Sequence, residues 1–138
     1  MKHFTLHLFG ADRVFYEGDC DSVIVPAVDG QYGVLADHAN LITAILPGAL
    51  TFTTPNEKPL TVAVAGGIMK VEDNDVLILV DSVLLPEEID ADRAREAAAA
   101  AREAMLQSKG MIEYRSAQAQ LARAISKLKV RRNGKTGR

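Results

Sequence analysis

The pattern of apolar residues changes at Pro86, and this change constrains the fold more than any other feature of the sequence. Before Pro86, short runs of alternating polar and apolar residues are separated by Gly, Pro, Asn and Asp, which is typical of β-strands and turns. After Pro86, apolar residues return every three or four positions, which is the period of an α-helix. We therefore predict a β domain over residues 1–86 and a helical region over residues 87–138.

The predicted β domain contains short segments with the length and composition of strands. In the first segment, Phe4, Leu6 and Leu8 share one face of an extended chain. The segments are residues 3–9, 14–17, 22–27, 32–35, 41–46, 49–53, 60–65, 68–72 and 76–82. Their shortness and even spacing predict an antiparallel β-sandwich or a flattened barrel.

The helical region is predicted to form an antiparallel two-helix hairpin. Asp90 is expected to cap the first helix with its carboxylate, and Gly110 is expected to end it in the left-handed conformation. The second helix is expected to run from about residue 112 to about residue 130. The predicted apolar faces are Ala94, Ala97, Ala98, Ala101, Ala104, Met105 and Ser108 on the first helix and Tyr114, Ala117, Leu121, Ile125 and Leu128 on the second. Because a buried methyl group contributes only about 0.8 kcal/mol, the alanine face predicts a weakly docked hairpin that can also pack elsewhere.

The net charge of −2 is divided unevenly between the two parts. Residues 1–86 carry 4 Lys/Arg against 11 Asp/Glu, a net −7, whereas residues 87–138 carry 12 against 7, a net +5. The last twelve residues hold six positive charges and no acid. The acidic first part, and the lack of aromatic residues near the basic ones, argue against nucleic-acid binding.

The residue types used in catalysis form no recognisable constellation. His3 and His7 lie roughly 13 Å apart on an extended strand, too far to bind one ion, so no metal site is expected. The single cysteine, Cys20, lies between two aspartates that disfavour its thiolate. Gly66-Gly67 lacks the Lys-Ser/Thr of a phosphate loop and predicts a tight turn. We expect a cytoplasmic protein, because no stretch resembles a signal peptide or a membrane-spanning helix.

Six short stretches, taken in order along the chain, carry a family resemblance. They are residues 29–35 (DGQYGVL), 38–41 (HANL), 46–48 (LPG), 65–68 (AGGI), 89–94 (IDADRA) and 121–125 (LARAI). Together they resemble the epsilon subunit of F-type ATP synthases, in register from about Phe4 to about Val130.

The resemblance implies a β-sandwich of about ten strands with a C-terminal hairpin, and a non-catalytic subunit of the rotor that requires no cofactor. The sandwich would bind the gamma subunit of the central stalk and touch the membrane-embedded c-ring. The hairpin would reach the α/β catalytic head and inhibit ATP hydrolysis. The protein would be peripheral, on the cytoplasmic side of the inner (plasma) membrane, and attached only through the complex. The alternative from another functional class is a free-standing ATP-sensing module.

Two loops correspond by resemblance to segments near the c-ring. They contain Gln31, and His38 with Ala39 and Asn40. Simple turn formation by the same residues remains the alternative.

The basic end of the second helix corresponds by resemblance to the part that acts on the catalytic head. Its cations Lys127, Lys129, Arg131 and Arg132 would be attracted to an acidic surface of a catalytic subunit. A solvated basic helix end, favoured by the helix dipole, is the alternative.

Some members of the family bind ATP as a regulatory ligand, through an Ile-Asp-x-x-Arg-Ala pattern and basic residues on the second helix. The matching residues here are Ile89, Asp90, Arg93, Ala94, Arg123 and Lys127. The alternative is that Asp90 only caps the helix and pairs with Arg93. Arg123 and Lys127 share a helical face roughly opposite the apolar stripe, which leaves open whether they converge on Asp90.

Overall fold

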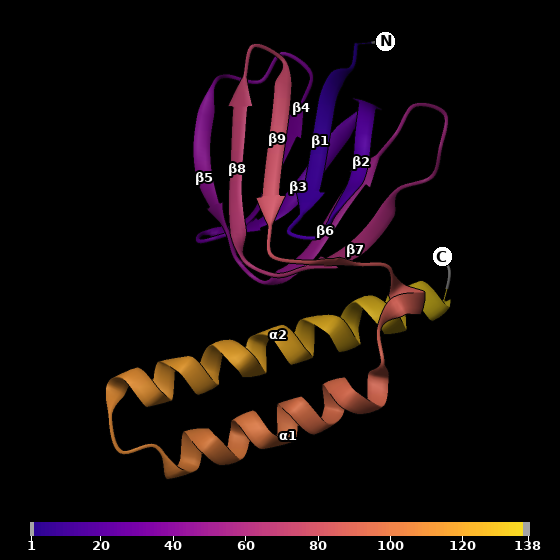
Figure 1. The fold of residues 1–138 in the computed structure, drawn as a ribbon. Helices are drawn as coiled ribbons and strands as arrows, with labels where there is room; N and C mark the ends of the chain where they lie inside the picture. The colour runs from indigo at the N-terminus through magenta and orange to yellow at the C-terminus, as the bar shows by residue number, and fades with distance from the viewer. Residues whose placement is uncertain (1, 137–138) are drawn as a thin grey trace.

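A sandwich of two five-stranded sheets stands above a hairpin of two helices (Figure 1). The computed structural model describes residues 2–136, and the side chains of residues 2–132. The N-terminal end of the described chain lies at the end of the sandwich farthest from the helices.

The strands are short and form two separate sheets. They are β1 (Phe4–Gly10), β2 (Arg13–Cys20), β3 (Ser22–Ala27), β4 (Gly30–Leu35), β5 (Leu41–Ile45), β6 (Gly48–Thr53), β7 (Leu60–Val64), β8 (Gly67–Glu72), β9 (Asp75–Val80) and β10 (Val83–Leu84). The first sheet has the order β2-β1-β9-β8-β5, and the second has the order β10-β7-β6-β3-β4. The two sheets remain distinct, so the predicted sandwich is confirmed over the flattened barrel.

The sandwich core is built by the alternation that the sequence shows. In β1, Phe4, Leu6 and Leu8 are buried, and the residues between them are more exposed. Both sheets contribute such residues, and together they fill one apolar layer between the sheets. The buried set is Phe4, Leu6, Leu8, Cys20, Val23, Val25, Val34, Ile45, Leu50, Phe52, Val62, Val64, Met69, Val71, Val76, Ile78, Val80 and Val83.

The sheets differ from the sequence prediction in three ways. β1 pairs with β9 in parallel, whereas the other neighbouring strands pair antiparallel. The two-residue strand β10 was not predicted, because it is too short to show a period. β2 also continues to Cys20, three residues beyond the predicted segment of residues 14–17.

The Gly66-Gly67 pair marks a close approach of two backbones. β8 begins at Gly67, and a Cβ atom added there would lie 1.9 Å from the carbonyl oxygen of Leu79 on β9. Backbone atoms cannot give way as a flexible side chain can, so only glycine fits at this position.

The hairpin consists of α1 (Ala91–Gln107) and α2 (Met111–Thr136), preceded by the short 3-10 helix η1 (Pro86–Glu88). The prediction that Gly110 ends the first helix was wrong. α1 ends at Gln107 with Ser108 as its cap, whereas the carbonyl group of Gly110 accepts the first hydrogen bond of α2, from the N–H of Tyr114 at 3.0 Å. The second helix also continues past the predicted end near residue 130, to Thr136.

The buried seam between the helices is narrower than predicted. Ala94, Ala98 and Ala101 are buried on α1, but Ala97 and Ala104 are exposed. On α2 the buried residues include Ala117, which was predicted, and Ala124, which was not. This spacing of three and four residues is that of two helices packed almost antiparallel.

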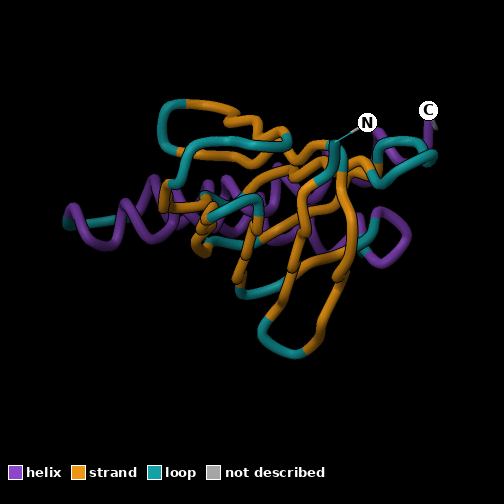
Figure 2. The backbone as a smooth tube through the Cα atoms, turned by 90° about the horizontal axis from the view of Figure 1, so that it is seen from above, coloured by secondary structure: helices purple, strands orange, loops and turns teal. Residues whose placement is uncertain are grey.

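A second, much smaller apolar cluster joins the hairpin to the sandwich. Ile89 and Val130 are buried against Ala63 of β7, with Ala49 and Leu84 packed at the edge. Seen from above, the turn between the helices projects beyond the sandwich (Figure 2). Among the described residues, the apolar contacts that dock the hairpin come from the C-terminal half of α2 and from the linker that precedes α1.

An imidazole links three strands on the outer face of the first sheet. The Nδ1 atom of His7 lies 2.6 Å from Glu17 Oε2 on β2, and its Nε2 atom lies 3.0 Å from Asp75 Oδ1 on β9. Both ring nitrogens can donate to carboxylates only when the imidazole is protonated. The hydrogen bond with Glu17, supported by Asp75, accordingly raises the pKa of His7 above its usual value.

We predict that this bridge makes the stability of the sandwich depend on pH. Because the pKa of His7 is higher in the folded chain than in the unfolded chain, its contribution is fully present below about pH 6.5 and is lost as the pH rises through the folded value. The difference in free energy of unfolding between the wild type and His7→Gln should therefore shrink from pH 5.5 to pH 8.5. Urea unfolding followed by circular dichroism measures it, and a pH-independent difference would contradict the bridge.

Candidate functional site

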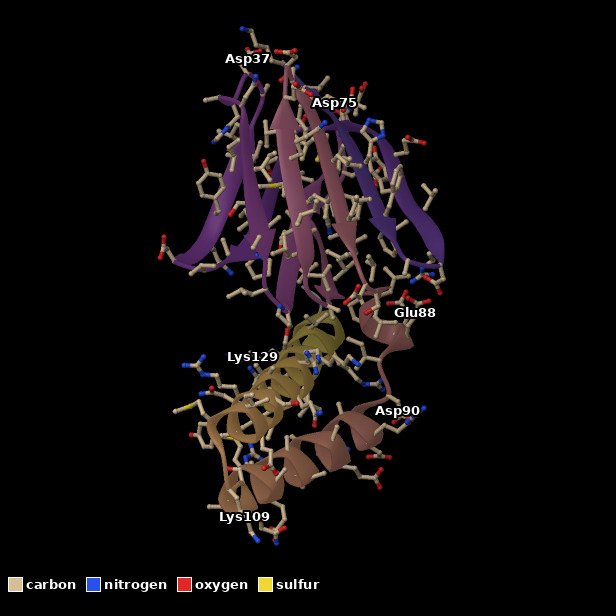
Figure 3. The ribbon with its side chains drawn as sticks, turned by 60° about the vertical axis from the view of Figure 1, so that its left-hand side comes forward. Asp37, Asp75, Glu88, Asp90, Lys109 and Lys129 are labelled. Carbon is tan, nitrogen blue, oxygen red and sulfur yellow. The ribbon has the colours of Figure 1, made fainter. Side chains whose placement is uncertain are left out.

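A pocket opens where the linker, the start of α1 and the middle of α2 meet below the sandwich. Its volume is about 600 Å³, within the range of small-molecule sites. Glu88 and Asp90 lie at this junction between the sandwich and the helices (Figure 3). The lining residues are Leu84, Glu88, Ile89, Asp90, Arg93, Ala94, Ala97, Ala100, Gln120, Arg123, Ala124 and Lys127.

All six residues that were matched to the nucleotide-binding pattern line this one pocket. Ile89, Asp90, Arg93 and Ala94 come from the linker and the first turn of α1, and Arg123 and Lys127 come from α2. The sequence left open whether Arg123 and Lys127 converge on Asp90, because the periodicity of α2 indicates only one apolar stripe. In the structure α2 packs against α1 and also against β6 and β7, so that Arg123 and Lys127 lie at the corner between these contacts.

The Asp90 carboxylate caps α1, as predicted. Its Oδ1 atom accepts hydrogen bonds from the N–H groups of Asp92 at 3.1 Å and Arg93 at 3.2 Å. The alternative also included an ion pair between Asp90 and Arg93, and the ion pairs within residues 2–132 do not include it. The cap instead holds the backbone of Arg93 in place at the pocket.

The charge of the pocket favours an anion. Arg93, Arg123 and Lys127 contribute three cations, and none of them takes part in an ion pair among the side chains that the structure describes. Two acids also line the pocket. Glu88 is engaged with Arg13, and that hydrogen bond lowers the pKa of Glu88, whereas Asp90 accepts the N–H groups at the start of α1. Three cations beside an alanine-lined wall suit a ligand with several phosphate groups and an apolar part.

The basic residues of the second helix do not form one free surface. Lys127 lines the pocket, and Arg131 donates a hydrogen bond to the carbonyl oxygen of Ile89. Lys129 and Arg132 are exposed. The last two cations of the sequence, at positions 135 and 138, lie outside the described side chains.

The residues matched to c-ring contacts lie at opposite ends of the sandwich. Gln31 pairs with Pro26 at the hairpin end, whereas the loop containing His38, Ala39 and Asn40 lies at the far end, beside Asp37 in Figure 3. That loop is held by the side chain of Asn40, whose Oδ1 accepts the N–H of Asp73 at 3.0 Å. One surface that touches both segments must therefore run along the length of β4.

An exposed row of apolar side chains crosses the outer face of the first sheet. The strand register brings together Val14, Phe9, Leu79, Ile68 and Ala44, one from each strand, and we call this set the apolar row. Val14, Leu79 and Ile68 are 61%, 41% and 48% exposed. Sequence reasoning missed this row, because it depends on the register of strands that are distant in sequence. The continuous apolar stretch from Val76 to Val80 was its only local signal.

Comparison with known proteins gives the family. The sequence model described as "ATP synthase, Delta/Epsilon chain, beta-sandwich domain" matches residues 3–86, and the one described as "ATP synthase, Delta/Epsilon chain, long alpha-helix domain" matches residues 87–131. The chain belongs to the delta/epsilon chain family of ATP synthases. The resemblance seen in the sequence motifs is thereby confirmed.

Individual relatives of this family match nearly end to end. The chain is 33% identical over 136 residues to ATP synthase epsilon chain 1 of Methylococcus capsulatus, with 97% of each chain covered. It is 37% identical over 137 residues to the ATP synthase epsilon chain of Caldicellulosiruptor saccharolyticus, with 97% of this chain and 99% of the relative covered.

Solved structures show the same fold. A chain in the Euglena gracilis mitochondrial ATP synthase structure of OSCP/F1/c-ring superposes with a TM-score of 0.79 at 23% identity, covering 90% of this chain and 78% of the other. A chain in the central stalk/c-ring structure of the Tetrahymena thermophila mitochondrial enzyme superposes with a TM-score of 0.69 at 14% identity, covering 92% and 95%.

Membership of the delta/epsilon family identifies a non-catalytic subunit of an ATP synthase. Burial raises the pKa of the Cys20 thiol, which donates a hydrogen bond to the carbonyl oxygen of Ser22 at 3.1 Å. Between residues 2 and 136, no helix is long and apolar enough to cross a membrane.

Proposed function

We propose that this delta/epsilon chain is a rotor subunit of the central stalk, whose sandwich joins the gamma subunit to the c-ring and whose hairpin inhibits ATP hydrolysis. The observation that carries the proposal is the contrast between the large sandwich core and the small cluster that docks the hairpin. Such a contrast lets one part stay bound while the other part moves. The two structural neighbours come from an OSCP/F1/c-ring structure and a central stalk/c-ring structure, and this supports the proposed location.

The apolar row is the surface that we assign to the gamma subunit. It spans all five strands of the first sheet, and a water-exposed row of this kind is a typical partner-binding feature. The c-ring would lie along β4, between Gln31 and the loop of His38, Ala39 and Asn40. Bound in this way, the chain would be peripheral on the cytoplasmic side of the inner (plasma) membrane and would take part in ion transport through the complex.

In the docked hairpin, part of the basic surface that would contact the catalytic head is engaged in contacts within the chain. Lys127 and Arg131 face the pocket and the linker, and only Lys129 and Arg132 are free for another surface. Release of the hairpin would present all four cations together. Inhibition of hydrolysis through an acidic surface of the α/β head then follows from charge complementarity.

ATP is the ligand that we assign to the pocket. Its phosphates would contact Arg93, Arg123 and Lys127, and its presence would tie α2 to the linker and the start of α1. A ligand that binds only the docked state stabilises that state in proportion to its concentration. ATP would therefore act as a regulatory ligand that keeps the hairpin docked, and not as a required cofactor.

The same pocket favours a second function, a free-standing ATP-sensing module. The two functions differ in whether a gamma subunit binds the sandwich tightly. The apolar row has no use in the free-standing module, so the rotor function accounts for more of the structure.

We predict that Ile68→Glu weakens binding of the gamma subunit from the same organism at least tenfold, because it places a charge within the apolar row. Isothermal titration measures the dissociation constant. Leu106→Glu is the matched control, since Leu106 is 84% exposed on the hairpin, away from the row. Equal binding by both variants would show that gamma does not use this face.

We predict that Arg93→Ala and Asp90→Ala each abolish detectable ATP binding while the fold is retained. The first change removes a phosphate contact, and the second removes the cap that positions Arg93, at a cost of about 1 kcal/mol to the helix. Arg102→Ala is the control, because Arg102 is exposed on α1 and does not line the pocket. Unchanged ATP titrations of both pocket variants would mean that Asp90 and Arg93 serve only to start the helix.

A further inference from the structure

The linker between the sandwich and the hairpin is fastened to β2 by Arg13. One guanidinium nitrogen, Nη2, donates to Glu88 Oε1 at 2.9 Å and also to the carbonyl oxygen of Val83 at 2.6 Å. The guanidinium also lies over the ring of Phe15, 5.2 Å from its centroid. Arg13 on β2 thus contacts both the backbone of β10 and the side chain of the last residue of η1.

The short helix η1 is closed by two hydrogen bonds between Leu85 and Glu88. The N–H of Leu85 donates to Glu88 Oε1 at 2.8 Å, and the N–H of Glu88 donates to the carbonyl oxygen of Leu85 at 2.9 Å. Pro86 restricts the first position of the turn. With Arg13 bound to Glu88, this turn forms a continuous hydrogen-bonded unit with the sandwich.

The chain leaves this unit at two extended residues. Ile89 has φ −85° and ψ 122°, and Asp90 has φ −84° and ψ 103°, so neither belongs to η1 or to α1. α2 makes one side-chain hydrogen bond to the linker among the described residues. In it, Arg131 donates to the carbonyl oxygen of Ile89. That bond exists only while α2 is docked.

We propose that the hinge of the hairpin is Ile89-Asp90, and that η1 moves with the sandwich and not with the helices. This inference rests on the proposed release of the hairpin. It places the hinge three residues beyond the boundary between the two family domains, which lies between residues 86 and 87. Release at this point leaves Glu88 on the sandwich and carries Arg93, Arg123 and Lys127 away, so that the movement itself takes the pocket apart.

Paired spin labels on the full chain test the position of the hinge. In a Cys20→Ser background, one label is placed at Glu57, in the turn before β7, and the second at either Glu87 in η1 or Arg102 in α1. All three positions are exposed. Electron–electron double resonance then gives both distances in the isolated chain and in the assembled ATP synthase.

We expect the distance from position 57 to position 102 to gain a second population in the complex, while the distance from 57 to 87 stays the same. If both distances change together, the hinge lies before η1 and the inference is wrong, although the release stands. If neither changes, the hairpin is not released, and the hinge is overturned together with the proposed function.

Two arginine variants, measured in the assembled complex, separate the role of the contact between Arg13 and Glu88 from that of the contact between Arg131 and Ile89. Arg13→Gln should broaden the distance distribution from 57 to 87, because it frees η1. Arg131→Gln should leave that distribution narrow and raise the released population seen from 57 to 102. A narrow 57 to 87 distribution in Arg13→Gln would contradict the attachment of η1 to the sandwich.

Discussion

The contact of Ile89 and Val130 with Ala63 is the interaction on which the behaviour of the whole molecule depends. Burial of an isoleucine or a valine contributes only about 1.5–3 kcal/mol, and part of this is offset by the entropy of ordering the hairpin. The sandwich core contains 18 buried residues and does not need this contact. Under the proposed function, the hairpin would detach without unfolding the β domain, and small influences would suffice to shift it between two positions.

Those influences meet at the linker. Arg131 contacts the linker from the docked hairpin, whereas Arg13 attaches η1 to the sandwich through Glu88. A polyanion in the pocket would add to the first set of contacts and leave the second unchanged. Lys127 is one of the three cations that would hold ATP in the docked state, and it also belongs to the basic helix end that would contact the catalytic head, so it cannot serve both uses at once. This competition gives a physical basis for regulation without catalysis by the chain itself.

Local features could be predicted from the sequence, and features that depend on distant contacts could not. The cap by Asp90 follows from one side chain and the next three residues, and the strand faces follow from alternation. The parallel pairing of β1 with β9 joins segments about 70 residues apart, and no period reports it. The position of Arg123 and Lys127 depends on α2 packing against two partners at once, which a helical wheel cannot show. Gly110 was misassigned because Ser108 caps α1 through its own hydroxyl group.

The central claim is that the sandwich and the hairpin have separable roles, and deletion of residues 90–138 in the assembled complex tests it most directly. The measurement is the rate of ATP hydrolysis, together with co-elution of the chain with the gamma subunit and the catalytic head on size exclusion. The account predicts that the shortened chain still co-elutes and that hydrolysis is faster than with the full chain. Loss of co-elution, or an unchanged rate with co-elution intact, would contradict it.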